Sequence, residues 1–294
     1  MKEISFADAR KVFRDYLQAH KRSPRTWYGY DSDLKSLQRD VEERRNLPVK
    51  VREITPMDIE RFIQRLGTQG MSGRTINRKL HALNSFFHCM QSHGVVAVNP
   101  AQVVARISVE KKERGFLTHE QLAALLNQPT DPLITPPLWT LAYTGQRVSE
   151  LCSLQKRDVD LDQRVIRVRG KGNRERTLPI HDDLHHILEG YTHHELRGVD
   201  AYDHFFHSHN TSTLSPSTMN RWLRNIVTHL GWSTHVTVHT LRHTFGYMYV
   251  DHGGNVVELQ KLLGHESLAT TSIYCHTTHT RLSEGISRFP HFGR

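Results

Sequence analysis

Arginine, lysine, histidine and tyrosine residues recur in four short motifs in the second half of the chain. In order, the motifs are Thr144-Gly145-Gln146-Arg147-Val148-Ser149-Glu150-Leu151, then Gly170-Lys171-Gly172-Asn173, then His239-Thr240-Leu241-Arg242-His243, then Leu263-Gly264-His265 with Tyr274 nine residues later. An arginine fork binds two phosphate oxygens at once and stays charged at neutral pH. A tyrosine hydroxyl becomes a nucleophile where a base and a positive pocket stabilise its phenolate. These residue types together are suited to phosphoryl transfer.

Each motif also has a purely structural interpretation. Arg147 lies one helical turn from Glu150 and could form an ion pair with it, and Lys171 could be a solvated hairpin lysine. His239 is three residues before Arg242, so both lie on one helix face, but it could equally be a surface histidine at a helix start. Tyr274 at helical spacing from its apolar neighbours could belong to a core. Only the ordered set of motifs favours the chemical interpretation.

In this order, and after a basic helical module, the motifs resemble the tyrosine recombinases, the phage integrase family, and most closely its short bacterial Xer-like members. The N-terminal part matches only in its helical pattern. The resemblance implies that Tyr274 is the nucleophile and that Glu150 is a supporting carboxylate. The five catalytic partners that it implies are Arg147, Lys171, His239, Arg242 and His265. In the family the arginines clamp the scissile phosphate, the hairpin lysine is the leading candidate for the acid, and the histidine at position 239 transfers a proton. The common Tyr-Thr-His of the family is Tyr274-Cys275-His276 here.

The resemblance also implies the reaction. Tyr274 would attack phosphorus, giving a 3′-phosphotyrosyl link and a free 5′ hydroxyl, with no cofactor, ATP or metal. Double-stranded DNA would be the partner, and a homotetramer on two sites, or a hetero-tetramer with a related recombinase, would exchange strands through a Holliday junction. The tail after Tyr274 would dock on a neighbouring protomer. Integration, excision, inversion and dimer resolution all use this catalytic set.

Two other functions use similar features. A type IB-like topoisomerase would share the chemistry but act without a specific site. A DNA-binding accessory protein that does not cut should have lost at least one of the catalytic residues, and all six are present.

The histidines and cysteines do not indicate a metal site or a disulfide framework. Neither histidine group, His204, His207 and His209 or His193 and His194, has zinc-finger spacing with cysteines. The chain has three cysteines, widely spaced and without a Cys-x-x-Cys pair, which fits a reducing cytoplasm. We therefore expect no metal and a cytoplasmic, nucleoid-associated protein.

The positive charge of the chain is concentrated near its start. Residues 1–114 hold 22 Lys and Arg against 13 Asp and Glu, while the rest of the chain holds 17 of each. An N-terminal module that contacts phosphates is the simplest interpretation. The side chains expected to contact DNA are on its fourth helix and around the later hairpin: Arg74, Asn77, Arg78, Lys79, Arg169 and Arg174.

Sequence periodicity indicates the elements that must position these residues. Ser23-Pro24 and Thr55-Pro56 predict helix starts, and apolar residues at three- and four-residue steps predict four helices before Gly94. Thr118 and Gln121 have capping-box spacing. Alternating residues predict strands over 159–161, 165–169 and 176–180. The prediction is a mainly α protein: a four-helix core-binding (SAM-like) domain over 1–106, a linker over 107–115, and an α+β catalytic domain with a small antiparallel sheet over 116–294. No stretch is apolar enough for a membrane span.

Overall fold

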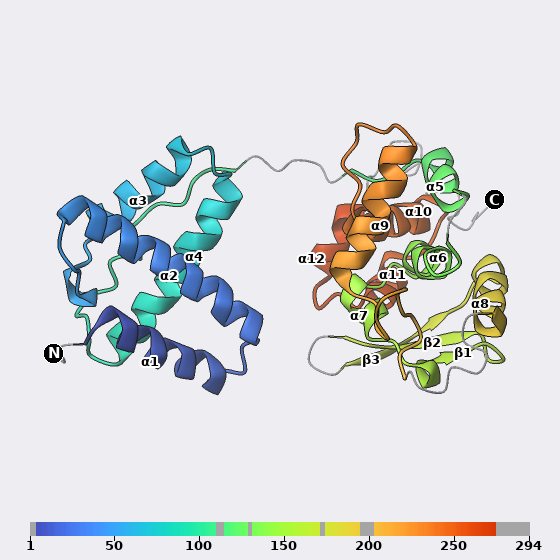
Figure 1. Cartoon of the computed structure of the whole chain (residues 1–294), viewed down its shortest axis with the longest axis horizontal. Coiled ribbons are helices and arrows are strands. Elements are labelled where there is room, and N and C mark those ends of the chain that lie inside the picture. Colours follow the sequence, from blue (N-terminus) through green and yellow to red (C-terminus); the bar gives the residue numbers. More distant parts are fainter. Residues whose placement is uncertain (1–3, 110–114, 129–130, 171–173, 195–202, 275–294) are drawn as a thin grey trace, which may run out of the picture. The chain divides into compact units, whose positions relative to one another are not determined.

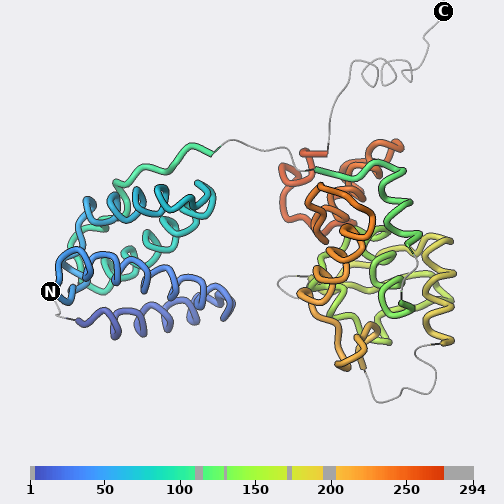
Figure 2. The backbone as a smooth tube through the Cα atoms, turned by 45° about the horizontal axis from the view of Figure 1, so that its top comes forward, coloured from blue at the N-terminus to red at the C-terminus, as the bar shows by residue number. Residues whose placement is uncertain are grey.

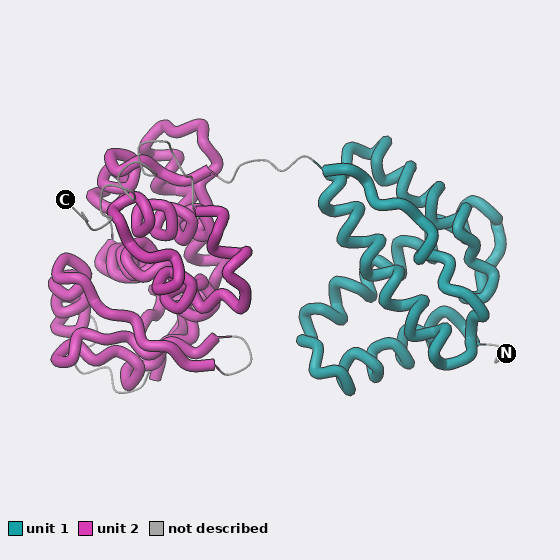
Figure 3. The backbone as a smooth tube through the Cα atoms, turned by 180° about the vertical axis from the view of Figure 1, so that it is seen from behind, with its two compact units in different colours: residues 1–112 teal, residues 113–294 magenta. Residues whose placement is uncertain are grey.

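The computed structural model describes residues 4–109, 115–128, 131–170, 174–194 and 203–274 (Figure 1). The chain divides into two compact units, Met1–Lys112 and Glu113–Arg294 (Figure 3). None of the helices in the described ranges has the length and apolar character needed to cross a membrane. Three sequence-based expectations fall outside the described residues: Lys171 with its hairpin turn, the docking tail after Tyr274, and most of the linker.

The first unit is helical throughout. It contains α1 (Phe6–Ala19), α2 (Pro24–Arg45), the 3-10 turn η1 (Val51–Glu53), α3 (Pro56–Thr68) and α4 (Gly73–Ser92). The predicted starts are confirmed, because Ser23 and Thr55 accept hydrogen bonds from backbone N–H groups of α2 and α3, and a proline follows each cap. The apolar stripe of α4 is buried as expected, and the largest enclosed side chains are phenylalanines: Phe13, Phe62, Phe86 and Phe87.

The second unit packs helices against a three-stranded antiparallel sheet, whose strands alternate between buried and exposed residues. The strands β1 (Val159–Asp160), β2 (Val165–Arg169) and β3 (Glu175–Pro179) lie in sequence order, and Arg167 pairs with Thr177 across β2 and β3. The predicted fold class is confirmed, and the strands agree with the prediction to within about one residue at each end. The capping box of Thr118 and Gln121 is also present.

The helices of this unit are α5 (His119–Leu126), α6 (Thr135–Thr144), α7 (Val148–Cys152), α8 (Asp182–His194), α9 (Pro216–His229), α10 (Val238–Asp251), α11 (Val256–Leu263) and α12 (Leu268–Thr271). The 3-10 turns are η2 (Lys156–Asp158) and η3 (Ser272–Tyr274). Helix α10 contacts α6, α9, α11 and η3, and the chain from 256 to 274 turns back beside it (Figure 2). Because α11 also contacts β3, side chains from widely separated parts of the sequence meet at the end of α11.

Candidate active site

Gly145 is the junction that brings the first arginine motif against the later helices. It ends α6 with φ 58°, a left-handed conformation that glycine adopts without strain. A Cβ at this position would lie 2.3 Å from a ring carbon of Phe245 and 2.9 Å from a methyl of Leu263. Only a glycine therefore lets the chain turn here and pack against α10 and α11. Two residues later Arg147 is the N-cap of α7.

Three consecutive carbonyls at the C-terminal end of α11 each accept a hydrogen bond from a different arginine. Arg176 Nε donates to the carbonyl of Leu262 at 2.8 Å, Arg242 Nη2 to that of Leu263 at 2.7 Å, and Arg147 Nη2 to that of Gly264 at 3.2 Å. These carbonyls have no partner within the helix and carry its partial negative charge. The end of α11 thus gathers guanidinium groups from β3, α10 and the start of α7.

Arg242 is the most enclosed of the three, with 6% of its surface exposed. Its Nη1 also donates to the carbonyl of Gly145 at 2.7 Å, so its fork joins the C-terminal ends of α6 and α11. Burial, and then the neighbouring charge of Arg147, lowers the pKa of Arg242 to about 10. The group therefore stays positive at neutral pH. A guanidinium has five N–H donors, so three remain after these two bonds among the described residues.

Glu150 is the carboxylate between two of these arginines. It accepts hydrogen bonds from the Arg147 backbone N–H and Nη1, both at 2.8 Å, and from Arg176 Nη2 at 2.8 Å. Burial opposes its charge, but the bonds from Arg176 and Arg147 outweigh burial and lower the pKa of Glu150. The ion pair between Arg147 and Glu150 considered from the sequence is therefore present, together with one from Arg176. Three guanidiniums and one carboxylate leave the cluster with two excess positive charges.

His265 follows the end of α11 and faces the same cluster. Its Nδ1 lies 2.9 Å from the hydroxyl of Thr271, a residue with no exposed surface. Burial first, and then the charges of Arg242 and Arg147, lowers the pKa of His265 to about 4. His265 is therefore neutral near pH 7. When Nδ1 accepts the Thr271 proton, Nε2 carries the N–H of the neutral ring and can donate to a ligand.

Tyr274 ends the described chain and is 5% exposed. Its ring lies on Gly246 of α10, where a Cβ would be 2.6 Å from the carbon that bears the hydroxyl. The hydroxyl lies 2.9 Å from Nδ1 of His243, also on α10. The ring that the sequence identified as a nucleophile is therefore buried, as a core residue would be, while its oxygen meets a polar group.

Two catalytic candidates from the sequence remain. His239 is an exposed residue in the first turn of α10, one turn before Arg242. Lys171 lies outside the described residues, between the ends of β2 and β3. A cavity of about 790 Å³ is lined by Arg147, Arg174, Arg176, Gly264, His265 and seven further residues that include Gly170 and Lys261. The cavity is where a phosphate could meet the arginines.

The expected DNA contacts in the first unit have different surroundings. Arg78 donates twice to the buried carboxylate of Asp33, at 2.7 and 2.9 Å, and Lys79 donates to it at 2.7 Å. Asn77 exchanges hydrogen bonds with the backbone of Ile107, which holds the chain after the bundle against α4. Arg74 is exposed and forms no ion pair within the described residues.

In the second unit, the two expected DNA contacts also differ. Arg169 pairs with Asp158 and Glu175, at 3.2 and 3.0 Å. Arg174 is exposed at the rim of the cavity.

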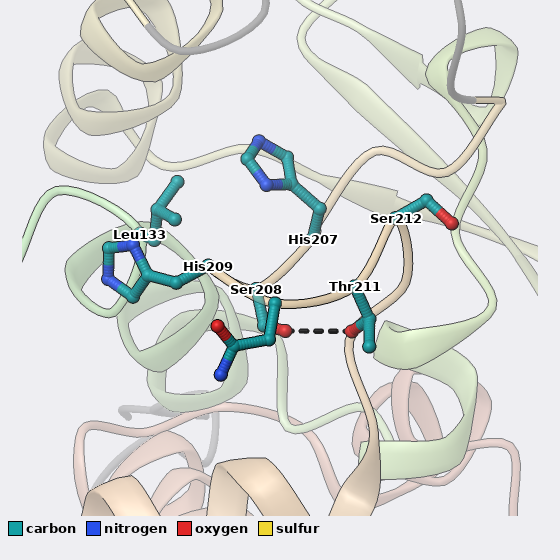
Figure 4. A pocket seen from close by; sticks show the side chains of 7 residues that line it. Leu133, His207, Ser208, His209, Thr211 and Ser212 are labelled. Carbon is teal, nitrogen blue, oxygen red and sulfur yellow. Dashed lines mark hydrogen bonds between the residues drawn. The ribbon is translucent and has the colours of Figure 1, made fainter.

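The histidine-rich segments lie apart from the arginine cluster. A second cavity, of about 470 Å³, is lined by Leu133 and the loop 207–212. Figure 4 shows the rings of His207 and His209 pointing in different directions from this loop, which a 2.8 Å hydrogen bond between Ser208 and Thr211 closes. His209 pairs with Asp131, and residue 204 forms a β-bridge with Gln155. On α8, possible ligand atoms of His185, His186 and Glu189 lie within 4.8 Å of one another.

Comparison with known proteins identifies the family. The model described as "Phage integrase family" matches residues 115–281, and "Phage integrase, N-terminal SAM-like domain" matches residues 11–94. The chain belongs to the phage integrase family. It is 30% identical over 289 residues to a tyrosine recombinase of Thermosipho africanus, covering 95% of this chain and 98% of that one. It is 34% identical to the tyrosine recombinase XerC of Oceanobacillus iheyensis, covering 94% of each chain.

Solved tyrosine recombinases show the same fold. The crystal structure of XerA recombinase matches with a TM-score of 0.53 and 26% identity, over 97% of this chain and 99% of that one. The Tn1549 transposon integrase in complex with a circular intermediate DNA matches with a TM-score of 0.77 and 19% identity, over 96% of this chain and 99% of that one.

Three residues that complete the cluster of this tyrosine recombinase were not identified from the sequence. Arg176 lies at the start of the strand predicted over 176–180 and His243 ends the third motif, but neither was given a role, and Gly246 lies outside the motifs. Arg176 and His243 carried a weak signal, since both are ionisable residues beside the motifs. Gly246 had none, because a glycine inside a helix shows its purpose only when the ring that covers it is known.

Proposed function

We propose that this tyrosine recombinase cuts and rejoins double-stranded DNA at specific sites through a covalent 3′-phosphotyrosyl link to Tyr274. The observation that carries the proposal is the convergence of Arg147, Arg242 and His265 at the end of α11. Tyr274 of η3 packs against the neighbouring helix α10. Family membership establishes tyrosine recombinase chemistry for the chain. The positions of these side chains support the assignment of individual roles.

The charge of the cluster fits attack on a phosphodiester. A phosphodiester carries one negative charge, and a pentavalent transition state carries a second on its non-bridging oxygens. The two excess positive charges of the cluster match this developing charge, in a site where burial strengthens each interaction. In this role Arg147 and Arg242 bind the non-bridging oxygens, and neutral His265 donates a hydrogen bond. Glu150 holds Arg147 in place rather than binding substrate.

The other roles follow the same scheme. Lys171 protonates the departing 5′ oxygen, His239 contacts the phosphate, and the first unit holds DNA through phosphate contacts in which Arg74 and, beside the cavity, Arg174 take part. Four protomers act on two sites. This assembly is supported by a solved lambda integrase tetramer bound to a Holliday junction, which covers 90% of this chain at a TM-score of 0.75 and 18% identity. The three cysteines and the DNA substrate favour action in the cytoplasm, on the nucleoid.

Covalent capture tests this proposal and identifies the recombination site in the same experiment. Wild type and Tyr274→Phe are incubated with nicked fragments of genomic DNA from the source organism, and protein–DNA adducts that survive denaturation are collected and sequenced. We expect wild type to enrich a defined sequence, with protein joined to the 3′ phosphate, and Tyr274→Phe to form no adduct. Tyr247→Phe is the matched control, because Tyr247 is on α10, against which Tyr274 packs, but stacks on Phe116, with 3.7 Å between ring centroids.

Three outcomes would contradict the proposal in different ways. An adduct formed by Tyr274→Phe would place the nucleophile elsewhere. Adducts spread evenly over all sequences, with relaxation of plasmids that lack the enriched site, would indicate a topoisomerase. Tight DNA binding with no adduct on any fragment would indicate a protein that binds without cutting.

A further inference from the structure

The hydroxyl of Tyr274 has a specific partner, Nδ1 of His243, at 2.9 Å. The ring centroids are 5.8 Å apart with an interplanar angle of 48°, so the two rings are tilted against each other and are not stacked. When Nε2 carries the imidazole proton, Nδ1 is an acceptor and the phenol is the donor. The contact therefore joins the atom that would attack phosphorus to an atom that can take its proton.

This contact is built into α10. His243 and Gly246 are three residues apart and share a helix face, and the phenol ring fills the space that a side chain at Gly246 would occupy. Tyr274 itself belongs to a small apolar cluster with Val250, Leu259 and Leu263. The ring is therefore held on two sides, and its hydroxyl is directed at Nδ1 by packing and not by a lone surface hydrogen bond.

The ionisable groups around the pair suit a proton transfer. Tyr274 interacts electrostatically with Arg242, whose positive charge would stabilise a phenolate. His265, after α11, is coupled electrostatically to His243 and is itself neutral near pH 7. Among the described residues, the phenol from η3 bonds to His243, neutral His265 lies near it after α11, and Arg242 precedes it on its own helix.

We propose that His243 is the general base that accepts the phenolic proton of Tyr274 as Tyr274 attacks. The proposal rests on the proposed role of Tyr274 as nucleophile. In this step the bond between Oη and phosphorus forms, the bond from phosphorus to the 5′ oxygen breaks, and the Oη proton moves to Nδ1. The 5′ oxygen takes a proton from the acid of the site, which is Lys171 in the scheme above. In the rejoining step His243 returns the proton to Tyr274.

The test is the pH dependence of single-turnover cleavage, measured on a nicked substrate that carries the captured site. For wild type we expect the rate to rise with pH as the imidazole of His243 loses its proton. For His243→Gln we expect a rate about 10²- to 10⁴-fold lower that lacks this rise and instead increases at higher pH, as the phenol itself ionises. DNA affinity should be unchanged, because the imidazole contacts the nucleophile.

Three further variants make the result specific. His239→Gln should be slower than wild type but keep the rise with pH that is lost in His243→Gln, which separates the two histidines of the motif. His252→Gln is the matched control at the C-cap of the same helix, where the exposed ring lies 2.9 Å from the carbonyl of Met248, and it should behave as wild type. In His243→Ala, added imidazole should restore part of the rate, because it can occupy the vacated position.

The proposal is overturned if His243→Gln cleaves as fast as wild type or faster with the same pH profile. The hydrogen bond would then only hold the Tyr274 ring in its buried position. It is also overturned if His243→Ala binds DNA normally but does not respond to imidazole, which would make His243 a positioning residue. These outcomes differ from failure of the proposed function, in which wild type itself forms no adduct that depends on Tyr274.

Discussion

Arg176 and Glu150 form a two-point ion pair, with 2.8 Å between Nη2 and Oε2 and 3.2 Å between Nη1 and Oε1. Both side chains are largely buried, with 13% and 4% exposed. Glu150 also accepts from the backbone and side chain of Arg147, so the pair connects strand β3 to the residue that would bind the phosphate. Because a buried charge depends on its partner, Arg176 contributes both to the fold and to the position of Arg147.

Replacing Arg176 should therefore reduce stability and cleavage together. We expect Arg176→Gln to lower the free energy of unfolding of the second unit by about 3 kcal/mol, because it leaves Glu150 with one guanidinium partner fewer. Cleavage should fall by about tenfold or more, because Arg147 loses its fixed position. Chemical denaturation and single-turnover cleavage measure the two effects, with Arg174→Gln, an exposed neighbour, as the stability control.

A double-mutant cycle separates the ion pair from other effects of the substitution. Together with Glu150→Gln, the Arg176→Gln variant should show a coupling energy of about 1–3 kcal/mol. Strictly additive losses would mean that Arg176 acts through its bond to the Leu262 carbonyl and not through Glu150.

Gly246→Ala should separate the stability of α10 from the position of Tyr274. Alanine raises helix propensity by about 1 kcal/mol, but its Cβ would lie 2.6–2.8 Å from three carbons of the phenol ring. We expect cleavage to fall by about tenfold or more, with DNA affinity retained, because the ring must leave its slot. Gly190→Ala in α8 is the control, since a Cβ there meets nothing within 4 Å; it should stabilise the protein without changing cleavage. Wild-type cleavage by Gly246→Ala would show that the space above Gly246 is not needed to position the Tyr274 ring.

The elements of the fold could be predicted from the sequence because their signals are local. Ser23 and Pro24 are adjacent in the sequence, as the start of α2 requires, and Thr118 reaches Gln121 only three residues away. The alternation of residues 165–169 likewise lies within β2. Short-range periodicity and capping therefore predicted where the elements begin and how they face the core.

The connections within the site could not be predicted, because their partners are distant in the sequence and are often backbone atoms. The carbonyl of Leu262 is 86 positions from Arg176, and that of Gly145 is 97 positions from Arg242. A carbonyl has no residue type, so no pattern marks it as an arginine partner. In the first unit, Arg78 and Lys79 were expected to face DNA, and only the fold shows that Asp33 binds both.

Asp33 provides a test of how the cations of α4 divide between fold and DNA. Its carboxylate is 1% exposed, so Asp33→Asn should lower the free energy of unfolding of the first unit by about 2–3 kcal/mol, because Arg78 and Lys79 lose a buried partner. Arg74→Ala should leave stability unchanged and weaken DNA binding at all sequences, with a smaller salt dependence. Thermal unfolding and binding titrations at several salt concentrations measure both. If Arg74→Ala lost as much stability as Asp33→Asn, Arg74 would support the fold, and its exposure would not mark it as a DNA contact.

His265 gives the protein a pH-dependent contribution to stability whose sign follows from its lowered pKa. The folded value of about 4 lies below the unfolded value of about 6.5, so between these values the unfolded chain binds the proton more readily. The contribution is complete above about pH 6.5 and is lost as the pH falls toward about 4, by about 1–3 kcal/mol after allowance for partial solvent access. Denaturation at several pH values should show a steeper loss for wild type than for His265→Gln over this window. Because carboxylates contribute equally to both proteins, the difference between the curves isolates the histidine, and parallel curves would contradict the lowered pKa of His265.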